Sequence, residues 1–136
     1  MTTAFGNGAN DRASAMALQP DGKIVVAGVA TMTAFQSDFA VARYNPDGSL
    51  YGTFGSGGKV TTNFPSRLRP STVDSTVSVA IQSDGALVVG GHSNSSFGEF
   101  ALVRYRPDGN LDLSFGSAGT VTTMFSQSGT ASGDGA

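Results

Sequence analysis

The stretch ALQPDGKIVVAG at residues 17–28 returns as AIQSDGALVVGG at residues 80–91, a displacement of 63 residues. Further along, FAVARYNPDGSLYGTFGSGG at residues 39–58 returns as FALVRYRPDGNLDLSFGSAG at residues 100–119, a displacement of 61 residues. Self-similarity at a fixed period marks a repeat architecture, in which each copy is one structural unit. We therefore expect two tandem copies of one unit to make up most of the chain.

The repeat also predicts where each unit begins and ends. Thr-Thr-Ala-Phe at residues 2–5 resembles residues 61–64 and 122–125, so a partial copy precedes the two full ones. We expect the ends of the chain to cut through a longer array. The predicted division is the end of a preceding repeat at 1–10, a first unit at 11–64, a connecting loop at 65–73, a second unit at 74–125, and a Ser/Gly-rich tail with the start of a further repeat at 126–136.

Each unit contains four short segments with the pattern of β-strands, separated by glycine-rich turns. No window has the apolar spacing at i, i+3, i+4 and i+7 that is typical of an amphipathic helix. The strands predicted for the first unit, each with a copy in the second, are Ala13–Gln19, Lys23–Ala27, Phe39–Tyr44 and Lys59–Phe64.

The second predicted strand is the most apolar part of each unit. It holds Ile-Val-Val at residues 24–26 and Leu-Val-Val at residues 87–89. Such a run does not alternate with polar residues, which indicates a strand covered on both faces. The predicted core residues are Ile24, Val26, Leu87 and Val89.

The joints between strands share an Asp-Gly pair. Proline precedes it at residues 20–22, 46–48 and 107–109, and serine at residues 83–85. Aspartate can accept hydrogen bonds from nearby amides and glycine can adopt positive φ, so these are predicted turns rather than calcium ligands. The residues assigned to turns are Asp21, Gly22, Asp47, Gly48, Asp84, Gly85, Asp108 and Gly109.

The size of the unit indicates how the copies are arranged. A four-stranded antiparallel sheet cannot cover both of its own faces, so it must stack on a neighbour. Small residues on the first strand, at Ala13, Ala15 and Ala17, suit the crowded axis of a radial array. We therefore predict an all-β fold made of four-stranded antiparallel β-propeller blades. A linear β-solenoid is the alternative, although its coils are generally shorter and have fewer hairpin turns.

The combined motif resembles one known family. It comprises a DGK-I-V-V-x-G hairpin, an F-x-x-x-R-Y-x-P-D-G strand and turn, and S-L-D-x-x-F-G-x-x-G. This pattern is similar to the delta-60 repeat β-propellers, which are bacterial and often secreted or surface-attached. The resemblance covers nearly the whole chain and implies blades of the observed length, with no assigned reaction. The chain departs from the pattern at Tyr51, where an aspartate like Asp112 is expected.

Composition excludes several classes of function. With 8 Lys+Arg against 10 Asp+Glu and a net charge of −2, the chain has no basic field for nucleic acid. Glu99 is the single glutamate, which argues against acid–base catalysis. Cysteine is absent and His92 is the single histidine, so thiolate metal sites and two-histidine metal sites within one chain are excluded. No apolar run approaches the ~20 residues of a membrane helix, so membrane insertion is not expected. No catalytic residue, metal or cofactor is assigned.

Two arginines lie on predicted strands among apolar neighbours. Arg104 is expected to pair with Asp112, whereas Arg43 needs a different acceptor because Tyr51 stands at the equivalent position. We interpret the pair Arg104 and Asp112 as structural. The alternative is a contact with an anionic or sugar ligand.

Two segments that differ between the copies are predicted to be variable loops, Thr31–Asp38 and His92–Glu99. Aromatic and amide side chains in such loops suit stacking on a sugar or contact with a protein. The candidate ligand-binding residues are Phe35, His92, Asn94 and Phe97.

These observations favour a non-catalytic scaffold or recognition module. A location outside the cell or on its surface follows from the family resemblance alone. The alternatives are a carbohydrate-binding propeller and a propeller hydrolase or lyase, although the latter lacks converging carboxylates. Because two blades leave two sheet faces uncovered, we expect either a homo-oligomer or further blades from a longer chain.

Overall fold

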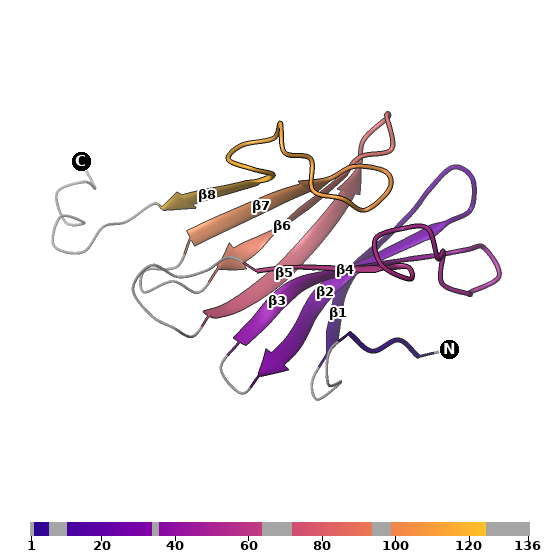
Figure 1. Cartoon of the computed structure of the whole chain (residues 1–136), viewed down its shortest axis with the longest axis horizontal. Helices are drawn as coiled ribbons and strands as arrows, with labels where there is room; N and C mark the ends of the chain where they lie inside the picture. Colours follow the sequence, from indigo (N-terminus) through magenta and orange to yellow (C-terminus); the bar gives the residue numbers. More distant parts are fainter. Residues whose placement is uncertain (1, 6–10, 34–35, 64–71, 94–98, 125–136) are drawn as a thin grey trace, which may run out of the picture.

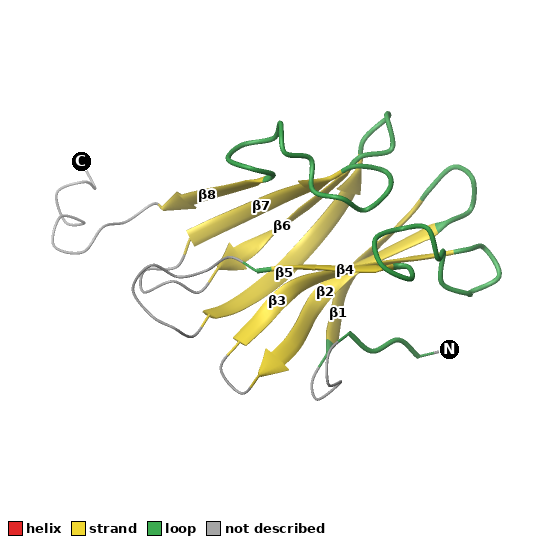
Figure 2. Ribbon diagram, viewed as in Figure 1, coloured by secondary structure: helices red, strands yellow, loops and turns green. Residues whose placement is uncertain are grey.

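The computed structural model describes residues 2–5, 11–33, 36–63, 72–93 and 99–124. The regular secondary structure in these ranges consists of β-strands alone (Figure 2). The strands are β1 (Arg12–Leu18), β2 (Ile24–Thr33), β3 (Gln36–Tyr44), β4 (Lys59–Thr62), β5 (Thr72–Ile81), β6 (Leu87–Ser93), β7 (Glu99–Tyr105) and β8 (Thr120–Met124). In these ranges, no helix is long and apolar enough to cross a membrane.

The strands form two four-stranded antiparallel sheets. Strands β1 to β4 pair in chain order and make blade 1, and strands β5 to β8 pair in the same way and make blade 2. The two sheets lie beside each other (Figure 1), and a short parallel contact joins Gln36 of β3 to Thr72 of β5. The prediction of an all-β fold with four-stranded propeller blades is confirmed.

The two blades repeat each other down to irregularities of the backbone. The pairing of β1 with β2 shifts between Ala13 and Ala15, and the pairing of β5 with β6 shifts between Thr76 and Ser78. A bulge at the same place in both copies bends the first strand of each blade. The shared bulge indicates that the repeated sequence encodes the backbone shape of the blade.

The Asp-Gly joints are tight turns. Asp21 Oδ1 accepts a hydrogen bond from the amide of Lys23 at 3.0 Å, and Asp108 Oδ1 accepts one from the amide of Asn110 at 2.9 Å. The aspartates of the other two turns accept equivalent bonds. The glycine that follows each aspartate has φ between +89° and +93°, a backbone conformation that residues other than glycine rarely adopt. Local chemistry therefore places the predicted turn residues.

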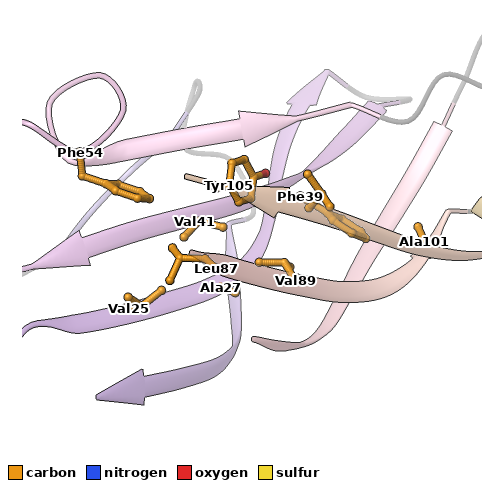
Figure 3. Packing of buried hydrophobic residues seen from close by; sticks show 10 residues of the cluster. Val25, Ala27, Phe39, Val41, Phe54, Leu87, Val89, Ala101 and Tyr105 are labelled. Carbon is orange, nitrogen blue, oxygen red and sulfur yellow. The ribbon is translucent and has the colours of Figure 1, made fainter. Parts of the chain in front are cut away.

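The core lies between the two sheets. Figure 3 shows that side chains of both blades point into one space, among them Val25, Val41 and Phe54 from blade 1 and Leu87 and Val89 from blade 2. All five are fully buried.

The predicted core is half wrong. Leu87 and Val89 are buried, but their counterparts Ile24 and Val26 are partly exposed, and Val25 between them is buried instead. The reason is that only one face of each sheet is covered within the chain. Adjacent residues of a strand point to opposite faces of the sheet. Blade 1 buries the face that carries Val25, whereas blade 2 buries the face that carries Leu87 and Val89.

The two predicted variable loops are also corrected. Strand β2 continues to Thr33 and β3 begins at Gln36, while β6 continues to Ser93 and β7 begins at Glu99. Backbone pairing persists along these segments because the hairpin ladder extends beyond the apolar run. Strand β5 begins at Thr72, inside the range 65–73 predicted as a loop. Residues 65–71 of that range and the predicted tail at 126–136 lie outside the described residues.

Candidate functional site

Among the described residues, three polar contacts join the blades in addition to the short pairing of β3 with β5. Arg43 Nη1 donates to the carbonyl oxygen of Pro107 at 2.6 Å. The amide of Gly55 donates to the carbonyl oxygen of Asp108 at 2.7 Å. The hydroxyl groups of Thr62 and Tyr105, 2.5 Å apart, share a hydrogen bond. Each contact runs from the third or fourth strand of blade 1, or the loop between them, to the third strand of blade 2 or the turn that follows it.

The turn of blade 2 approaches blade 1 very closely. A Cβ atom placed on Gly109 would lie 2.5 Å from the amide nitrogen of Gly55, which is closer than Cβ atoms come to other heavy atoms in real structures. Gly48, at the same position in blade 1, has nothing within 4 Å of such an atom. Glycine at position 109 is therefore needed both for the close packing and for the positive φ. At position 48, glycine is needed only for the positive φ.

Arg43 is buried between the blades without a carboxylate partner. It is 4% exposed, its guanidinium lies 4.4 Å from the centre of the Phe54 ring, and Tyr51 stands 5.9 Å away. Its Nε and Nη2 atoms have no hydrogen-bond partner among the described residues. Burial lowers the pKa of Arg43 below its usual value, because removal of water penalises the charged form.

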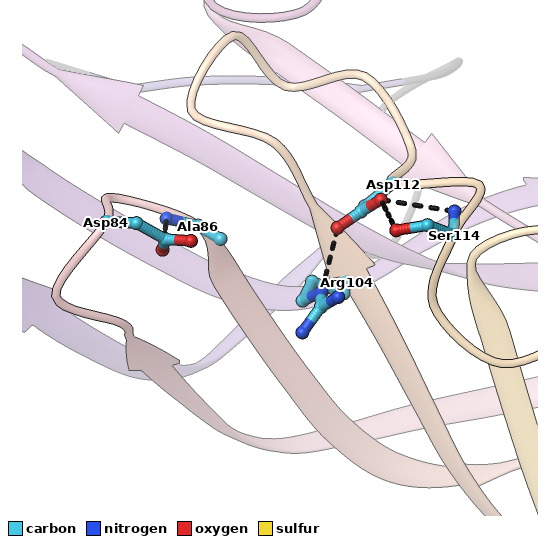
Figure 4. A network of polar contacts seen from close by, with 5 residues as sticks. All are labelled: Asp84, Ala86, Arg104, Asp112 and Ser114. Atoms are coloured by element: carbon cyan, nitrogen blue, oxygen red, sulfur yellow. Dashed lines mark hydrogen bonds and ion pairs between the residues drawn. The ribbon is translucent and has the colours of Figure 1, made fainter.

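In blade 2, Arg104 has the equivalent phenylalanine as a neighbour, and an acid in place of Tyr51. Its guanidinium lies 4.6 Å from the centre of the Phe115 ring, and Nε donates to Asp112 Oδ2 at 2.9 Å (Figure 4). Asp112 Oδ1 also accepts from the hydroxyl and the amide of Ser114. The hydroxyl of Ser114 is the main cause that lowers the pKa of Asp112, and Arg104 adds to it. The structure thus brings together the pair Arg104 and Asp112 and gives Arg43 a different acceptor.

Tyr105 is the largest fully buried side chain of the interface. Desolvation raises the pKa of its hydroxyl well above the usual value, although the bond to Thr62 acts in the opposite direction. A neutral tyrosine with a hydroxyl partner satisfies its polar group inside an apolar contact.

Blade 2 has an open face that repeats the packed face of blade 1. Phe39 is 0% exposed between the blades, whereas its counterpart Phe100 is 62% exposed. Leu102, the counterpart of Val41, is also exposed, and it lines an apolar groove of about 280 Å³ together with Phe100 and Val121. We define the open face of blade 2 by Phe100, Leu102, Arg104, Phe115 and Val121.

Blade 1 has an open face that repeats the packed face of blade 2. Met16 and Leu18 are 68% and 67% exposed, whereas their counterparts Val79 and Ile81 pack against the core. We define the open face of blade 1 by Met16, Leu18, Ile24, Val26 and Tyr44.

Residues 2–5 lie on this open face of blade 1. The hydroxyl of Tyr44 donates to Thr3 Oγ1 at 2.7 Å, and Lys59 Nζ donates to the carbonyl oxygen of Ala4 at 2.7 Å. Thr3, Phe5, Val26 and Tyr44 are among the residues that line a groove of about 300 Å³ beneath the segment. Thr3 therefore contacts Tyr44 as Thr62 contacts Tyr105.

Of the four candidate ligand-binding residues, only His92 lies in the described part of the chain. His92 is an exposed residue of β6, paired with Phe100 of β7, and does not begin a loop. Phe35, Asn94 and Phe97 lie outside the described residues. In the described ranges, no group of three or more His, Asp or Glu side chains could hold a metal ion.

Sequence reasoning missed the residues that join the blades, notably Thr62, Tyr105 and Pro107. The signal was present, because a threonine recurs at residues 3, 62 and 123 and a tyrosine at residues 44 and 105. Polar residues repeated among apolar strand positions indicate a polar contact that each blade makes with the next.

A family model described as "Domain of unknown function (DUF5122) beta-propeller" matches the chain over residues 19–62 and 82–115, more than half of its length. The two matched segments fall in blade 1 and blade 2. No curated protein and no solved structure matches the chain.

Proposed function

Because the chain belongs to the DUF5122 family of β-propellers, we propose that it is a non-catalytic scaffold or recognition module that packs its open faces against further blades. The single observation that carries this proposal is the contrast between Phe39, buried between the blades, and Phe100, exposed at the equivalent position. A large apolar side chain on a strand favours contact with another surface over contact with water.

The carboxylates of the turns and of Asp112 support a structural assignment over a catalytic one. The aspartates of the four turns accept hydrogen bonds from the amides of their own turns, and Asp112 is held by Arg104 and Ser114. Groups engaged in this way stabilise the backbone and do not converge on a common point for catalysis.

The similarity to delta-60 repeat proteins supports a location outside a bacterial cell or on its surface. Fractionation of the source cells, followed by immunodetection of the protein, tests this part separately. Recovery only from the cytoplasmic fraction would contradict it.

Association is tested by light scattering of the 136-residue chain across a range of concentrations. We expect a mass that rises above the 13.8 kDa of one chain, and a shift back toward one chain for Phe100→Glu. Ser83→Glu is the matched control, because the equivalent Pro20 stays exposed although its blade is packed against blade 2. A single-chain mass at every concentration up to the high micromolar range would contradict the proposal.

A further inference from the structure

We propose that blade 2 of one copy of this chain packs on blade 1 of a second copy, in the register in which blade 1 packs on blade 2 within the chain, and that residues 2–5 leave that face when it is covered. The inference rests on the proposed function and names the partner as a second copy of the chain.

The first argument is that the three polar contacts described above have repeat equivalents on the two open faces. Arg43, Gly55 and Thr62 donate or share hydrogen bonds across the interface, and their repeat equivalents Arg104, Gly116 and Thr123 lie on or beside the open face of blade 2. The acceptors Pro107, Asp108 and Tyr105 correspond to Pro46, Asp47 and Tyr44 of blade 1.

The predicted contacts between copies follow directly. Arg104 would donate to the carbonyl oxygen of Pro46, the amide of Gly116 to that of Asp47, and Thr123 would pair with Tyr44. Space is available for the second of these contacts. Within the chain, Gly55 packs against Gly109, and nothing lies within 4 Å of a Cβ atom placed on Gly48, the equivalent of Gly109.

The second argument is the match between the apolar surfaces. Within the chain, Phe39 and Val41 share one buried cluster with Leu87 and Val89, and Ile81 packs against it. In the open faces, the corresponding residues are Phe100 and Leu102 on blade 2, and Ile24, Val26 and Leu18 on blade 1. The open face of blade 2 repeats the packed face of blade 1, and the open face of blade 1 repeats the packed face of blade 2. The two open faces should therefore fit each other as the two packed faces do.

The third argument concerns the buried charge. Covering the open face of blade 2 would bury Arg104, and an unpaired guanidinium is costly in an apolar interface. Arg104 already has an ion pair with Asp112. Arg43 has no ion pair with any described residue and instead contacts the Pro107 carbonyl and two aromatic rings. The contact between copies would therefore have better charge pairing than the one within the chain.

The fourth argument is the position of residues 2–5. Their sequence matches the fourth strand of each blade, and Thr3 already occupies on Tyr44 the place that Thr62 occupies on Tyr105. Strand β8 of a second copy would bring Thr123 to the same hydroxyl group. Because one place cannot hold both segments, residues 2–5 and β8 must compete for Tyr44.

The decisive experiment mixes two variants that block different faces. Phe100→Glu places a charge on the open face of blade 2, and Leu18→Glu places one on the open face of blade 1. A head-to-tail contact joins two different surfaces, so each variant alone should be a single chain. The equimolar mixture should form a 1:1 dimer, because the intact blade 2 face of Leu18→Glu can still bind the intact blade 1 face of Phe100→Glu.

The outcomes separate this inference from the proposed function. If the intact chain associates but the mixture yields no 1:1 dimer, or if either variant still associates alone, the head-to-tail contact is wrong and the proposed function stands. If the intact chain and the mixture are both single chains, both proposals fail. Urea unfolding of each variant confirms folding, and Leu102→Glu replaces Phe100→Glu if the latter does not fold.

Competition by residues 2–5 is tested by deleting residues 1–5. Loss of the competing hydrogen bond and its contacts should lower the dissociation constant of the assembly by roughly tenfold. The control is Thr123→Ala, which should raise the dissociation constant because it removes the group that takes the place of Thr3. An unchanged or weaker association after the deletion would show that residues 2–5 do not compete with β8.

Discussion

Blade 1 and blade 2 have nearly the same backbone and closely similar sequences, yet they bury opposite faces. Blade 1 packs through Phe39 and Val41, and blade 2 packs through Leu87 and Val89. The residues of blade 2 equivalent to the first pair are exposed, and those of blade 1 equivalent to the second pair are partly exposed. The difference teaches that burial in a repeat protein belongs to the junction between two units, because the same residue is core or surface according to its neighbour.

The largest expected difference between the blades is at the repeated phenylalanine. Phe39→Ala should lower the free energy of unfolding by about 3–5 kcal/mol, because it empties a fully buried position. Phe100→Ala should change it by no more than about 0.5 kcal/mol in the single chain, because that side chain is exposed. Urea unfolding below the concentration of association measures both. Equal losses would mean that the two blades do not differ in which face is covered.

The repeated tyrosine should give the next largest difference. Tyr105→Phe leaves the buried hydroxyl of Thr62 without its partner and should cost about 1–2 kcal/mol. Tyr44→Phe should cost less than about 1 kcal/mol, because Tyr44 and Thr3 are both partly open to water. Thermal or urea unfolding of the two variants at neutral pH distinguishes the positions.

Alkaline pH sharpens the same comparison. The pKa of Tyr105 is raised in the folded state, so its contribution to stability is complete below the ordinary tyrosine value of 10.0 and is lost as the pH rises above it. Tyr105→Phe should remove part of the alkaline loss of stability. Unfolding midpoints measured below and above pH 10 provide the test, and an identical alkaline loss in the variant would contradict the assignment.

A smaller difference is expected in the loop before the fourth strand. Gly57 of blade 1 has φ of +63°, and Ala118 has φ of +56° at the same position of blade 2. A residue with a Cβ atom is strained there, so Ala118→Gly should stabilise the protein by about 0.5–1 kcal/mol. Gly57→Ala should cost a similar amount, since nothing lies within 4 Å to clash with the added methyl group. Melting temperatures that move in the same direction for both variants would contradict this account.

The smallest effect is expected for the coupling between Arg104 and Asp112, because a partly exposed ion pair contributes little. The pKa of Asp112 lies below its ordinary value of 3.8 in the folded state, so its contribution is present above that pH and is lost as the pH falls through the lowered value. A double-mutant cycle of Arg104→Met and Asp112→Asn should show favourable coupling at neutral pH that disappears in acid. The matching cycle of Arg43→Met and Tyr51→Phe should not show this acid loss, because that contact contains no carboxylate. Coupling between Arg104 and Asp112 that persists in strong acid would exclude the ion pair as its source.

The repeat, the four strands of each blade and the turns between them could all be predicted from the sequence. These features depend on interactions within a few residues: glycine accepts the positive φ at Gly22 and Gly109, and the preceding aspartate binds the turn amide. The same local logic predicted that Arg104 meets Asp112, eight residues away along one turn. The ends of the β2 and β6 strands were predicted too early, because backbone pairing extends past the apolar residues that mark a strand.

Which of its two similar faces each blade buries depends on how the sheets pack against each other. The run Ile-Val-Val at residues 24–26 is apolar on both sides, so its composition favours neither face, and contact with blade 2 covers Val25 and leaves Ile24 and Val26 partly exposed. The recurring threonine and tyrosine indicate a polar contact, but the sequence pattern does not say which threonine meets which tyrosine. The pairs Thr62–Tyr105 and Thr3–Tyr44 each join residues about 40 positions apart. Such contacts arise when whole sheets pack against each other, and their partners are set by the order of blades in space.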